Sequence, residues 1–350
     1  MKKIILTLSS AVLFVACSKP GLAPIPKDAI QPTIVTQQTP NDTDDPAVWI
    51  NKNNPDESII VGTDKFKENG GLYAYNLKGE IINKIVPLNR PNNVDVAYGF
   101  NYQGKQIDIA ITTERGNNKI RIVSLPDFKL IDNGGVEVFA NEEFRDPMGI
   151  ATYKLGDKIY AIVGRKSGPS ENYLFQYLLE DNNGKIEAKL VRKFGKYSGK
   201  KEIEAIAVDQ ELGFIYYCDE TAGVRKYYAD PSKGNEELSF FGQKDFKRDH
   251  EGIAIYKTSA TDGYLLISDQ QANYFNVYKR QGDSNNPNKH EIIAKIPVST
   301  IECDGADAIN FNFNSTFPKG FFIAMSNGKT FQLYDWRIIQ KEIDKQYQPK

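Results

Sequence analysis

Leu72-Tyr73-Ala74-Tyr75-Asn76-Leu77 is the first copy of a pattern that recurs along the whole chain. A short strand with an aromatic or apolar anchor returns every 48 to 56 residues. The six copies lie at 72–77, 120–125, 174–179, 224–229, 275–280 and 331–336. Repeats of this length, built only from short strands and turns, are typical of a β-propeller, in which each blade is a small antiparallel sheet. We therefore predict an all-β, six-bladed β-propeller with four-stranded antiparallel blades.

The order of strands within a repeat follows from the alternation of apolar and polar residues. The first repeat predicts an inner strand at 47–50, a second strand at 58–62, the anchored strand and a polar outer strand at 80–88. The last repeat ends after Trp336 in a polar tail that would make a poor fourth strand. The segment from Ile30 to Gln38 could supply that strand and cover the open sheet edge. We therefore expect an N-terminal strand to close the last blade.

The N-terminus has the features of an export signal. Lys2 and Lys3 precede an apolar run from Ile4 to Ala16, which is too short to span a membrane. Because a small residue directly precedes Cys17, we expect residues 1–17 to be a lipoprotein signal peptide with a lipidated Cys17. An ordinary signal peptide with an incidental Cys17 is the alternative.

Three segments of the chain are therefore expected: the signal peptide, a Pro-rich tether at 18–29 and a propeller domain at 30–350. The protein would be exported and lipid-anchored in the bacterial cell envelope, facing the periplasm or the cell surface. The formal net charge of −1 predicts no bulk attraction to nucleic acid or membrane, so membrane contact would come only through the anchor. We expect a monomer.

Two further cysteines, Cys218 and Cys303, fall in the fourth and sixth repeats. A disulfide requires Cα atoms within about 7 Å, which residues in separate blades rarely satisfy. We therefore expect both to be free, buried thiols.

Alignment of the six repeats brings charged residues into equivalent positions. Just before the apolar stretch of each inner strand, four blades carry a carboxylate and one carries an amide; these positions are Asp45, Asn93, Met148, Glu204, Glu251 and Asp304. At the ends of the second strands, the first three blades carry cations and the next two carry an acid or an amide; these positions are Lys65, Arg115, Lys166, Glu220 and Gln270. Because strand direction alternates within a blade, both sets converge on one mouth of the central channel.

The chemistry of that mouth is predicted from its segregated charges. Carboxylates this close together cannot all remain ionised without compensation, and calcium accepts six to eight oxygen ligands in irregular geometry. Lysine and arginine converging from three blades suit phosphate. Any one of these residues could be an ordinary turn former or surface charge. Their segregation by sign favours a site for a calcium-complexed polyphosphate.

Several segments also match a known family. They are Asp44-Asp45-Pro46-Ala47-Val48-Trp49, Asn92-Asn93-Val94-Asp95, Asp249-His250-Glu251-Gly252, Gly263-Tyr264-Leu265-Leu266, Tyr278-Lys279-Arg280-Gln281-Gly282 and Asp304-Gly305. Over residues 44–336 the chain resembles the β-propeller phytases, the alkaline, calcium-dependent 3-phytase family. The resemblance implies that Lys65, Arg115 and Lys166 grip the phosphate that is cleaved. It also implies calcium ligands, which are Asp44, Glu204, Glu220, Asp249, Glu251, Gln270 and Asp304; additional candidates are Asp45, Asn93 and Asp95.

The implied activity is that of a phosphoric monoester hydrolase. It would use several calcium ions to hydrolyse myo-inositol hexakisphosphate and its calcium salt, removing phosphates stepwise by direct attack of a calcium-bound water. Such a mechanism requires no serine, cysteine or histidine nucleophile.

The chain departs from the family pattern at three places. Met148 stands where the family usually has a tyrosine, and Ala205 replaces a common glycine. The segment before Asp304 is short, so only Glu302 could serve as an acid that the family places upstream. Two other functions are considered: a calcium-dependent lactonase on the same architecture, which has no use for three convergent cations, and a non-catalytic, lipid-anchored propeller that binds phosphorylated or sugar ligands.

Overall fold

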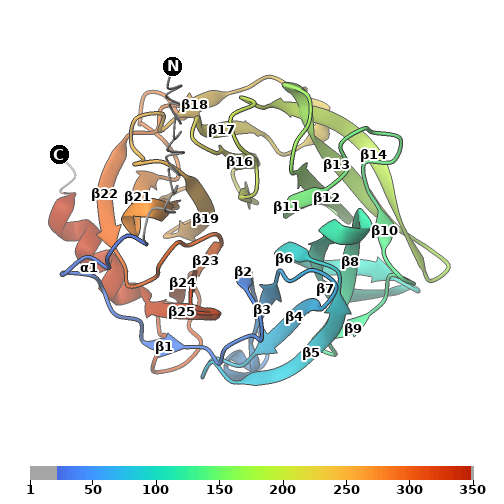
Figure 1. The fold of residues 1–350 in the computed structure, drawn as a ribbon, viewed down its shortest axis with the longest axis horizontal. Helices are drawn as coiled ribbons and strands as arrows, with labels where there is room; N and C mark the ends of the chain where they lie inside the picture. Colours follow the sequence, from blue (N-terminus) through green and yellow to red (C-terminus); the bar gives the residue numbers. More distant parts are fainter. Residues whose placement is uncertain (1–21, 348–350) are drawn as a thin grey trace, which may run out of the picture.

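The computed structural model describes residues 22–347. The predicted signal peptide, including Cys17, lies outside the described residues. Six antiparallel sheets are arranged in a ring (Figure 1). This arrangement confirms the prediction of an all-β, six-bladed propeller.

The first three blades follow one another along the chain. The first contains β2 (Thr43–Trp49), β3 (Ile59–Asp64), β4 (Gly70–Tyr75) and β5 (Ile81–Leu88). The second contains β6 (Pro91–Tyr102), β7 (Lys105–Glu114) and β8 (Lys119–Leu125), with the short strands β9 (Lys129–Leu130) and β10 (Val136–Glu137) both paired to β8. The third contains β11 (Pro147–Leu155), β12 (Lys158–Arg165), β13 (Glu171–Asn182) and β14 (Lys185–Lys196).

The remaining blades complete the ring. The fourth contains β15 (Ile206–Asp209), β16 (Phe214–Asp219), β17 (Gly223–Tyr228) and β18 (Ser239–Phe241). The fifth contains β19 (His250–Lys257), β20 (Gly263–Asp269), β21 (Tyr274–Lys279) and β22 (Ile292–Pro297). The sixth contains β23 (Ala306–Ile309), β24 (Phe321–Ser326), β25 (Thr330–Asp335) and β1 (Ile34–Val35). Four single-turn helices are η1 (Pro55–Glu57), η2 (Arg115–Asn117), η3 (Pro231–Lys233) and η4 (Gln270–Ala272).

The ring is closed by its own N-terminal segment. β1 pairs antiparallel with β25, with Ile34 opposite Leu333 (Figure 1). This pairing confirms the predicted closure and gives the last blade its fourth strand. Part of the predicted tether also contacts the fifth blade, since the Asn273 side-chain amide donates to the carbonyl of Ala23 at 3.1 Å.

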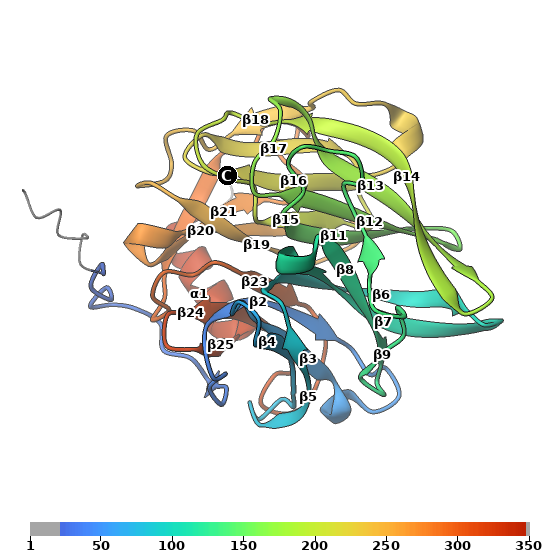
Figure 2. The same cartoon turned by 45° about the vertical axis from the view of Figure 1, so that its right-hand side comes forward.

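The polar tail after the last blade forms the helix α1 (Trp336–Gln346), which lies beside β22 and β25 (Figures 1 and 2). Asp335 caps its first turn by accepting from the backbone N–H of Arg337 at 3.0 Å. Ile339 and Ile343, four residues apart, are buried on one face, which explains why a mainly polar sequence packs here. Among residues 22–347, no helix has the length and apolar character that a membrane crossing would need.

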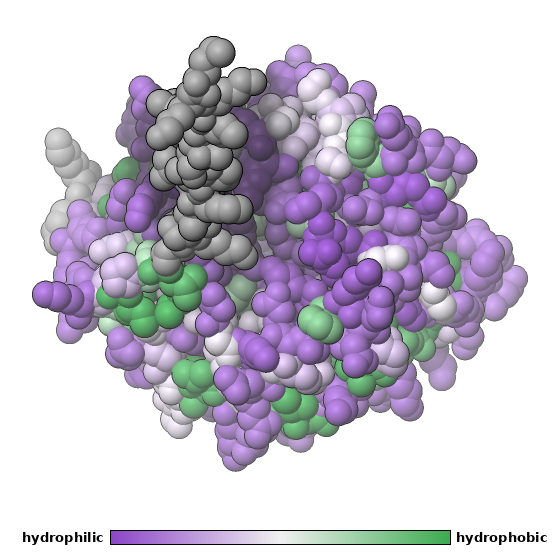
Figure 3. Space-filling model, viewed as in Figure 1, coloured by the Kyte–Doolittle hydropathy of each residue, from purple (hydrophilic) through white to green (hydrophobic). Residues whose placement is uncertain are grey.

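Apolar side chains fill the space between neighbouring blades, and the face seen in Figure 3 is largely hydrophilic. Gly62 of β3 shows how closely the first and sixth blades pack. A Cβ atom at this position would lie 2.2 Å from the ring of Phe331. This contact fixes the end of β3 relative to the last blade. Cys218 and Cys303 are free and buried, as predicted.

Candidate active site

The ends of the six second strands lie at one mouth of the ring, in equivalent backbone settings. In every blade, the residue at this position donates its backbone N–H to a carbonyl in the segment entering the same blade. The six donor and acceptor pairs are Lys65 with Asp42 at 2.8 Å, Arg115 with Arg90 at 3.0 Å, Lys166 with Asp146 at 2.8 Å, Glu220 with Glu202 at 3.1 Å, Gln270 with Asp249 at 3.1 Å and Asn327 with Ile301 at 2.8 Å. The predicted alignment of the strand ends is therefore confirmed.

A carboxylate directly before four of these positions fixes the entering segment. Each accepts a hydrogen bond from a backbone N–H of that segment. The pairs are Asp64 with Asp42 at 2.9 Å, Glu114 with Asn89 at 2.8 Å, Asp219 with Ser198 at 2.9 Å and Asp269 with Lys247 at 2.9 Å. These acids have a structural role, because each one ties the end of the second strand to the segment that enters the same blade.

The predicted alignment of the inner strands is wrong by one residue in the first two blades. Pro46 lies opposite Gly62 and Val94 opposite Thr112, so Asp44 and Asn92, two places earlier, are equivalent to Glu251, which stands two places before Ile253 opposite Ile267. A bulge follows this position in β2 and β6, and also in β11 and β19, where the predicted alignment is right. The first two blades differ in carrying a pair of identical residues there, Asp44-Asp45 and Asn92-Asn93, so residue type alone does not fix the position.

The bulge turns the residues predicted for that position to other partners. The Asp45 carboxylate accepts from the backbone N–H of Val94 in the next blade at 3.1 Å. Asp95 accepts from the backbone N–H and the hydroxyl of Thr152, at 2.6 and 2.8 Å. The backbone carbonyl of Asn93 accepts from the hydroxyl of Thr112 at 2.8 Å, and its side-chain oxygen is buried. In this structure Asp45 and Asp95 therefore link neighbouring blades.

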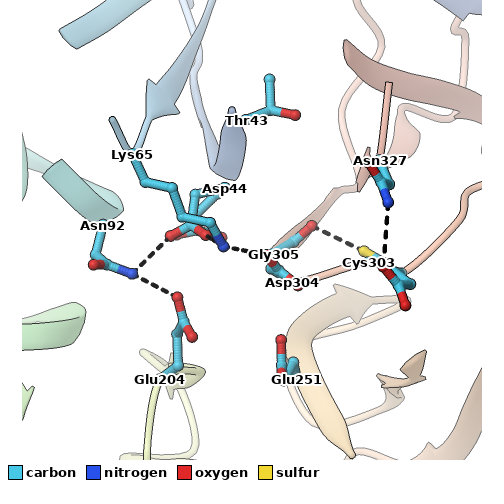
Figure 4. Close-up of polar contacts among 12 residues, drawn as sticks. Thr43, Asp44, Lys65, Asn92, Glu204, Glu251, Cys303, Asp304, Gly305 and Asn327 are labelled. Carbon is cyan, nitrogen blue, oxygen red and sulfur yellow. Dashed lines mark hydrogen bonds and ion pairs between the residues drawn. The ribbon is translucent and has the colours of Figure 1, made fainter. Parts of the chain in front are cut away.

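The first acidic cluster surrounds the Lys65 ammonium (Figure 4). The ammonium lies 2.5 Å from Asp44 Oδ1 and is also paired with Asp304. The Asn92 amide bridges two acids, donating to Asp44 Oδ2 at 3.0 Å and to Glu204 Oε1 at 2.6 Å. Carboxylates from the first, fourth and sixth blades thus meet at one point.

The second cluster contains Glu220, Asp249 and Glu251, whose ligand oxygens lie within 4.8 Å of one another. The Gln270 amide joins the two clusters by donating to Glu251 Oε2 at 2.9 Å and to Asp304 Oδ1 at 2.6 Å. Glu202 and Glu204 form a third such group with Glu220. All seven residues proposed as calcium ligands therefore lie in one continuous network.

Lys201 and Glu202 were missed by the sequence analysis. The Lys201 ammonium lies within the second cluster, and Glu202 pairs with Lys166. Both residues come from the irregular 197–205 segment between β14 and β15, so no strand register pointed to them. The only signal in the sequence was their closeness to Glu204.

The remaining predicted cations lie at the first turns that follow their strands. Arg115 begins η2 and is partly exposed, and its guanidinium makes no hydrogen bond or ion pair with any residue between 22 and 347. Burial, together with the charge of nearby Arg90, lowers its pKa. Lys166 is more exposed, at 41% of its side chain. Arg115 is therefore available to an anionic ligand, and Lys166 would become so by leaving its pair with Glu202.

Burial controls the ionisation of the acids. It raises the pKa of Glu204 and of Glu251 well above the ordinary value, and neighbouring carboxylates add to the effect. Burial also raises the pKa of Glu220, to about 7. For Asp304, burial works in the same direction, but the charge of Lys65 and the hydrogen bonds from neighbouring side chains together outweigh it, and the pKa is lowered. The acids therefore need cations to be fully ionised at neutral pH.

These residues fit a calcium ion. Three buried oxygens, Glu220 Oε1, Asp249 Oδ1 and Asn92 Oδ1, accept no hydrogen bond from any residue that the structure describes. Buried carboxylate and amide oxygens of this kind are normally paired. Calcium binds such oxygens and tolerates irregular arrangements of them.

Two of the departures noted in the sequence are visible in the structure. The Met148 side chain is 1% exposed and presents no polar group to the mouth. Glu302 accepts from the Asn327 side-chain amide at 3.2 Å, so its carboxylate lies beside the sixth strand end.

Comparison with known proteins gives three results. The phytase family model matches residues 14–344. A curated 3-phytase of Bacillus subtilis (strain 168) is 28% identical over 321 residues, covering 86% of this chain and 81% of the relative. Among solved structures, BBS1N in complex with ARL6DN aligns with a TM-score of 0.50 at 9% identity, over 82% of this chain and 76% of that chain, and shows the fold alone.

Proposed function

Because the chain belongs to the phytase family, we propose that this propeller is a calcium-dependent phytase that acts at the mouth described above. A phytase is a phosphoric monoester hydrolase, and its family implies inositol hexakisphosphate as substrate. The observation that carries the proposal is the meeting, at one mouth, of a buried acidic network with cations that follow three neighbouring strand ends. A polyanion and its counter-cations require both kinds of charge.

Strand-borne cations would bind the phosphate that is cleaved. Lys65, Arg115 and Lys166 leave equivalent strand ends, so their side chains would reach one phosphate from three neighbouring blades without a rearrangement of the backbone. Arginine can offer two parallel N–H donors to a phosphate, whereas lysine acts as a point charge. Fixed positive charge also stabilises the oxygens on which negative charge develops during hydrolysis.

The acidic network would hold the calcium ions. Asp44, Glu204 and Asp304 would contribute from the first cluster, and Glu220, Asp249 and Glu251 from the second. When bound, calcium would neutralise substrate charge and supply an activated water. Asn92 and Gln270 each donate to two acids and thereby orient the carboxylates. Asn92 Oδ1 has no donor among the described residues and would be free to bind the metal, whereas Gln270 Oε1 would first have to leave the Gln271 amide.

The described residues offer no well-placed covalent nucleophile. Burial raises the pKa of the Cys218 and Cys303 thiols well above the ordinary value, which suppresses the thiolate. Burial lowers the pKa of His290 to about 4, and its ring contacts the Lys279 carbonyl at 3.0 Å. Direct hydrolysis is therefore the route that these residues support.

The cellular setting belongs to the same proposal. The apolar run from Ile4 to Ala16 and the residues before Cys17 support export and lipid anchoring. The catalytic domain would then act outside the cytoplasm, where calcium is abundant.

Phosphate release from inositol hexakisphosphate by the purified protein tests the proposed function, with calcium supplied or chelated. We expect release with calcium and little release with excess chelator, because the acids must hold the metal. Equal release in both conditions would refute the calcium requirement. Binding without release, from a folded protein, would refute the enzyme and favour a binding module.

A further inference from the structure

Lys201 lies inside a group of three buried acids. Its ammonium is 2.7 Å from Glu220 Oε2, 2.9 Å from Asp249 Oδ2 and 3.3 Å from Glu251 Oε1. The ammonium is therefore a positive charge enclosed by these acids.

The same three residues are the calcium ligands of the second cluster in the proposed function. Calcium binds oxygens at about 2.3–2.6 Å and needs several of them at once. Because the three carboxylates already converge on the Lys201 ammonium, that ammonium takes the position in which a metal ion would reach all three. An ammonium and a calcium ion cannot share it.

Lys201 has a way out of the cluster. Its side chain is 35% exposed, and the 197–205 segment that carries it contains no strand or helix. Gly199, two residues earlier, has open space around it and a φ of +74°. The segment is anchored at Ser198, whose backbone N–H and hydroxyl both donate to Asp219. The Lys201 carbonyl also accepts from the Tyr197 hydroxyl at 2.5 Å, so the ammonium can leave by rotation of its own side chain while the backbone stays in place.

We propose that Lys201 is a built-in competitor for calcium at the Glu220–Asp249–Glu251 group. It neutralises the acids when the metal is absent and is displaced toward solvent when calcium binds. The protein would thus remain folded without calcium, at the cost of a lower affinity for one ion. This inference rests on the calcium binding that the proposed function requires.

A matched pair of variants distinguishes an ammonium that occupies the metal position from the general effect of one positive charge nearby. Lys200→Gln removes the same charge from the same segment, but within residues 22–347 the Lys200 ammonium donates only to the Thr221 carbonyl, at 3.3 Å. Calcium titration of metal-stripped protein should show one site in Lys201→Gln with roughly tenfold or more tighter affinity, as expected from removal of a directly competing charge. Lys200→Gln should change the calcium affinity of that site by less than about threefold. Equal shifts in the two variants, or unchanged or weaker binding in Lys201→Gln, would overturn the proposal.

The unmutated protein provides a second measurement, which does not depend on the folding of a variant. Labelling with an amine-reactive reagent, followed by mass spectrometry, should modify Lys201 faster when calcium is added, while Lys200 is unchanged. Unchanged or slower labelling of Lys201, in protein that binds calcium and releases phosphate, would overturn this proposal and leave the proposed function intact. A protein that binds no calcium would overturn both.

Discussion

Lys65 and Lys201 both lie among carboxylates at the same mouth, but the chain holds them differently. Lys65 directly follows β3, and its backbone N–H is bonded to the Asp42 carbonyl at 2.8 Å. Lys201 lies in the irregular segment before β15. The exposed fraction of the side chain is 22% for Lys65 and 35% for Lys201. One ammonium is therefore positioned by a sheet, and the other by a loop.

The difference indicates different roles for the two charges. Groups on strands are held more accurately than groups on loops, so Lys65 suits a constant contact with the reacting phosphate. A loop lysine gives up its position at a lower cost, so Lys201 suits an exchangeable contact. Substitutions at the two sites should accordingly separate catalysis from metal affinity.

The largest effect is expected from Lys65→Ala. Loss of a fixed donor to the charge that develops on phosphate should lower kcat/KM by roughly a hundredfold to a thousandfold or more. Phosphate release under saturating calcium measures this loss. Thermal unfolding should confirm that the variant is folded.

Lys67→Ala is the matched control. The Lys67 side chain is 75% exposed, and its ion pair with Glu68 is 3.8 Å long. Its activity should stay within about twofold of the unmutated protein, because exposed ion pairs contribute little. Near-normal turnover in Lys65→Ala would contradict the catalytic role that distinguishes Lys65 from Lys201.

The strand-borne half of the site could be predicted from the sequence. Apolar second strands end at a constant point in each repeat, so Lys65, Arg115 and Lys166 fell into one alignment. The inner strands were harder in the first two blades, because each carries two identical polar residues in succession, Asp44-Asp45 and Asn92-Asn93. Residue type therefore could not decide which of the two is equivalent to Glu204 and Glu251.

The loop-borne half could not be predicted in the same way. Lys201 and Glu202 lie in a segment with no periodicity, and nothing in its composition shows which side chains turn inward. Tertiary packing decides this. Asp249 entered only through a family resemblance, although it contributes to the second cluster as directly as Glu251 does.

The next largest effect is a dependence of stability on pH, which tests the second acidic cluster. Burial raises the pKa of Glu220 from 4.5 to about 7, so the folded state binds this proton more tightly than the unfolded chain. The resulting stabilisation is fully present below pH 4.5 and is lost as pH rises through about 7. The metal-free protein should therefore lose up to about 3 kcal/mol of stability from this group between pH 5 and 8.

Thermal unfolding at several pH values, with chelator, measures this loss as the difference between the unmutated protein and Glu220→Gln. The difference should shrink when calcium is added, because the metal favours the ionised carboxylate. A difference that does not change with pH would contradict the raised pKa that burial gives to Glu220.

The smallest effect is expected from Lys166→Ala. Lys166 leaves a strand end, as Lys65 does, but its side chain is 41% exposed and is already paired with Glu202. Solvent screens such a charge, so we expect kcat/KM to fall by roughly tenfold. Lys193→Ala, which breaks a comparably exposed ion pair with Glu142 outside the mouth, is the control and should leave activity unchanged. A loss as large as that of Lys65→Ala would mean that attachment to a strand, and not burial among acids, determines how much a cation contributes to catalysis.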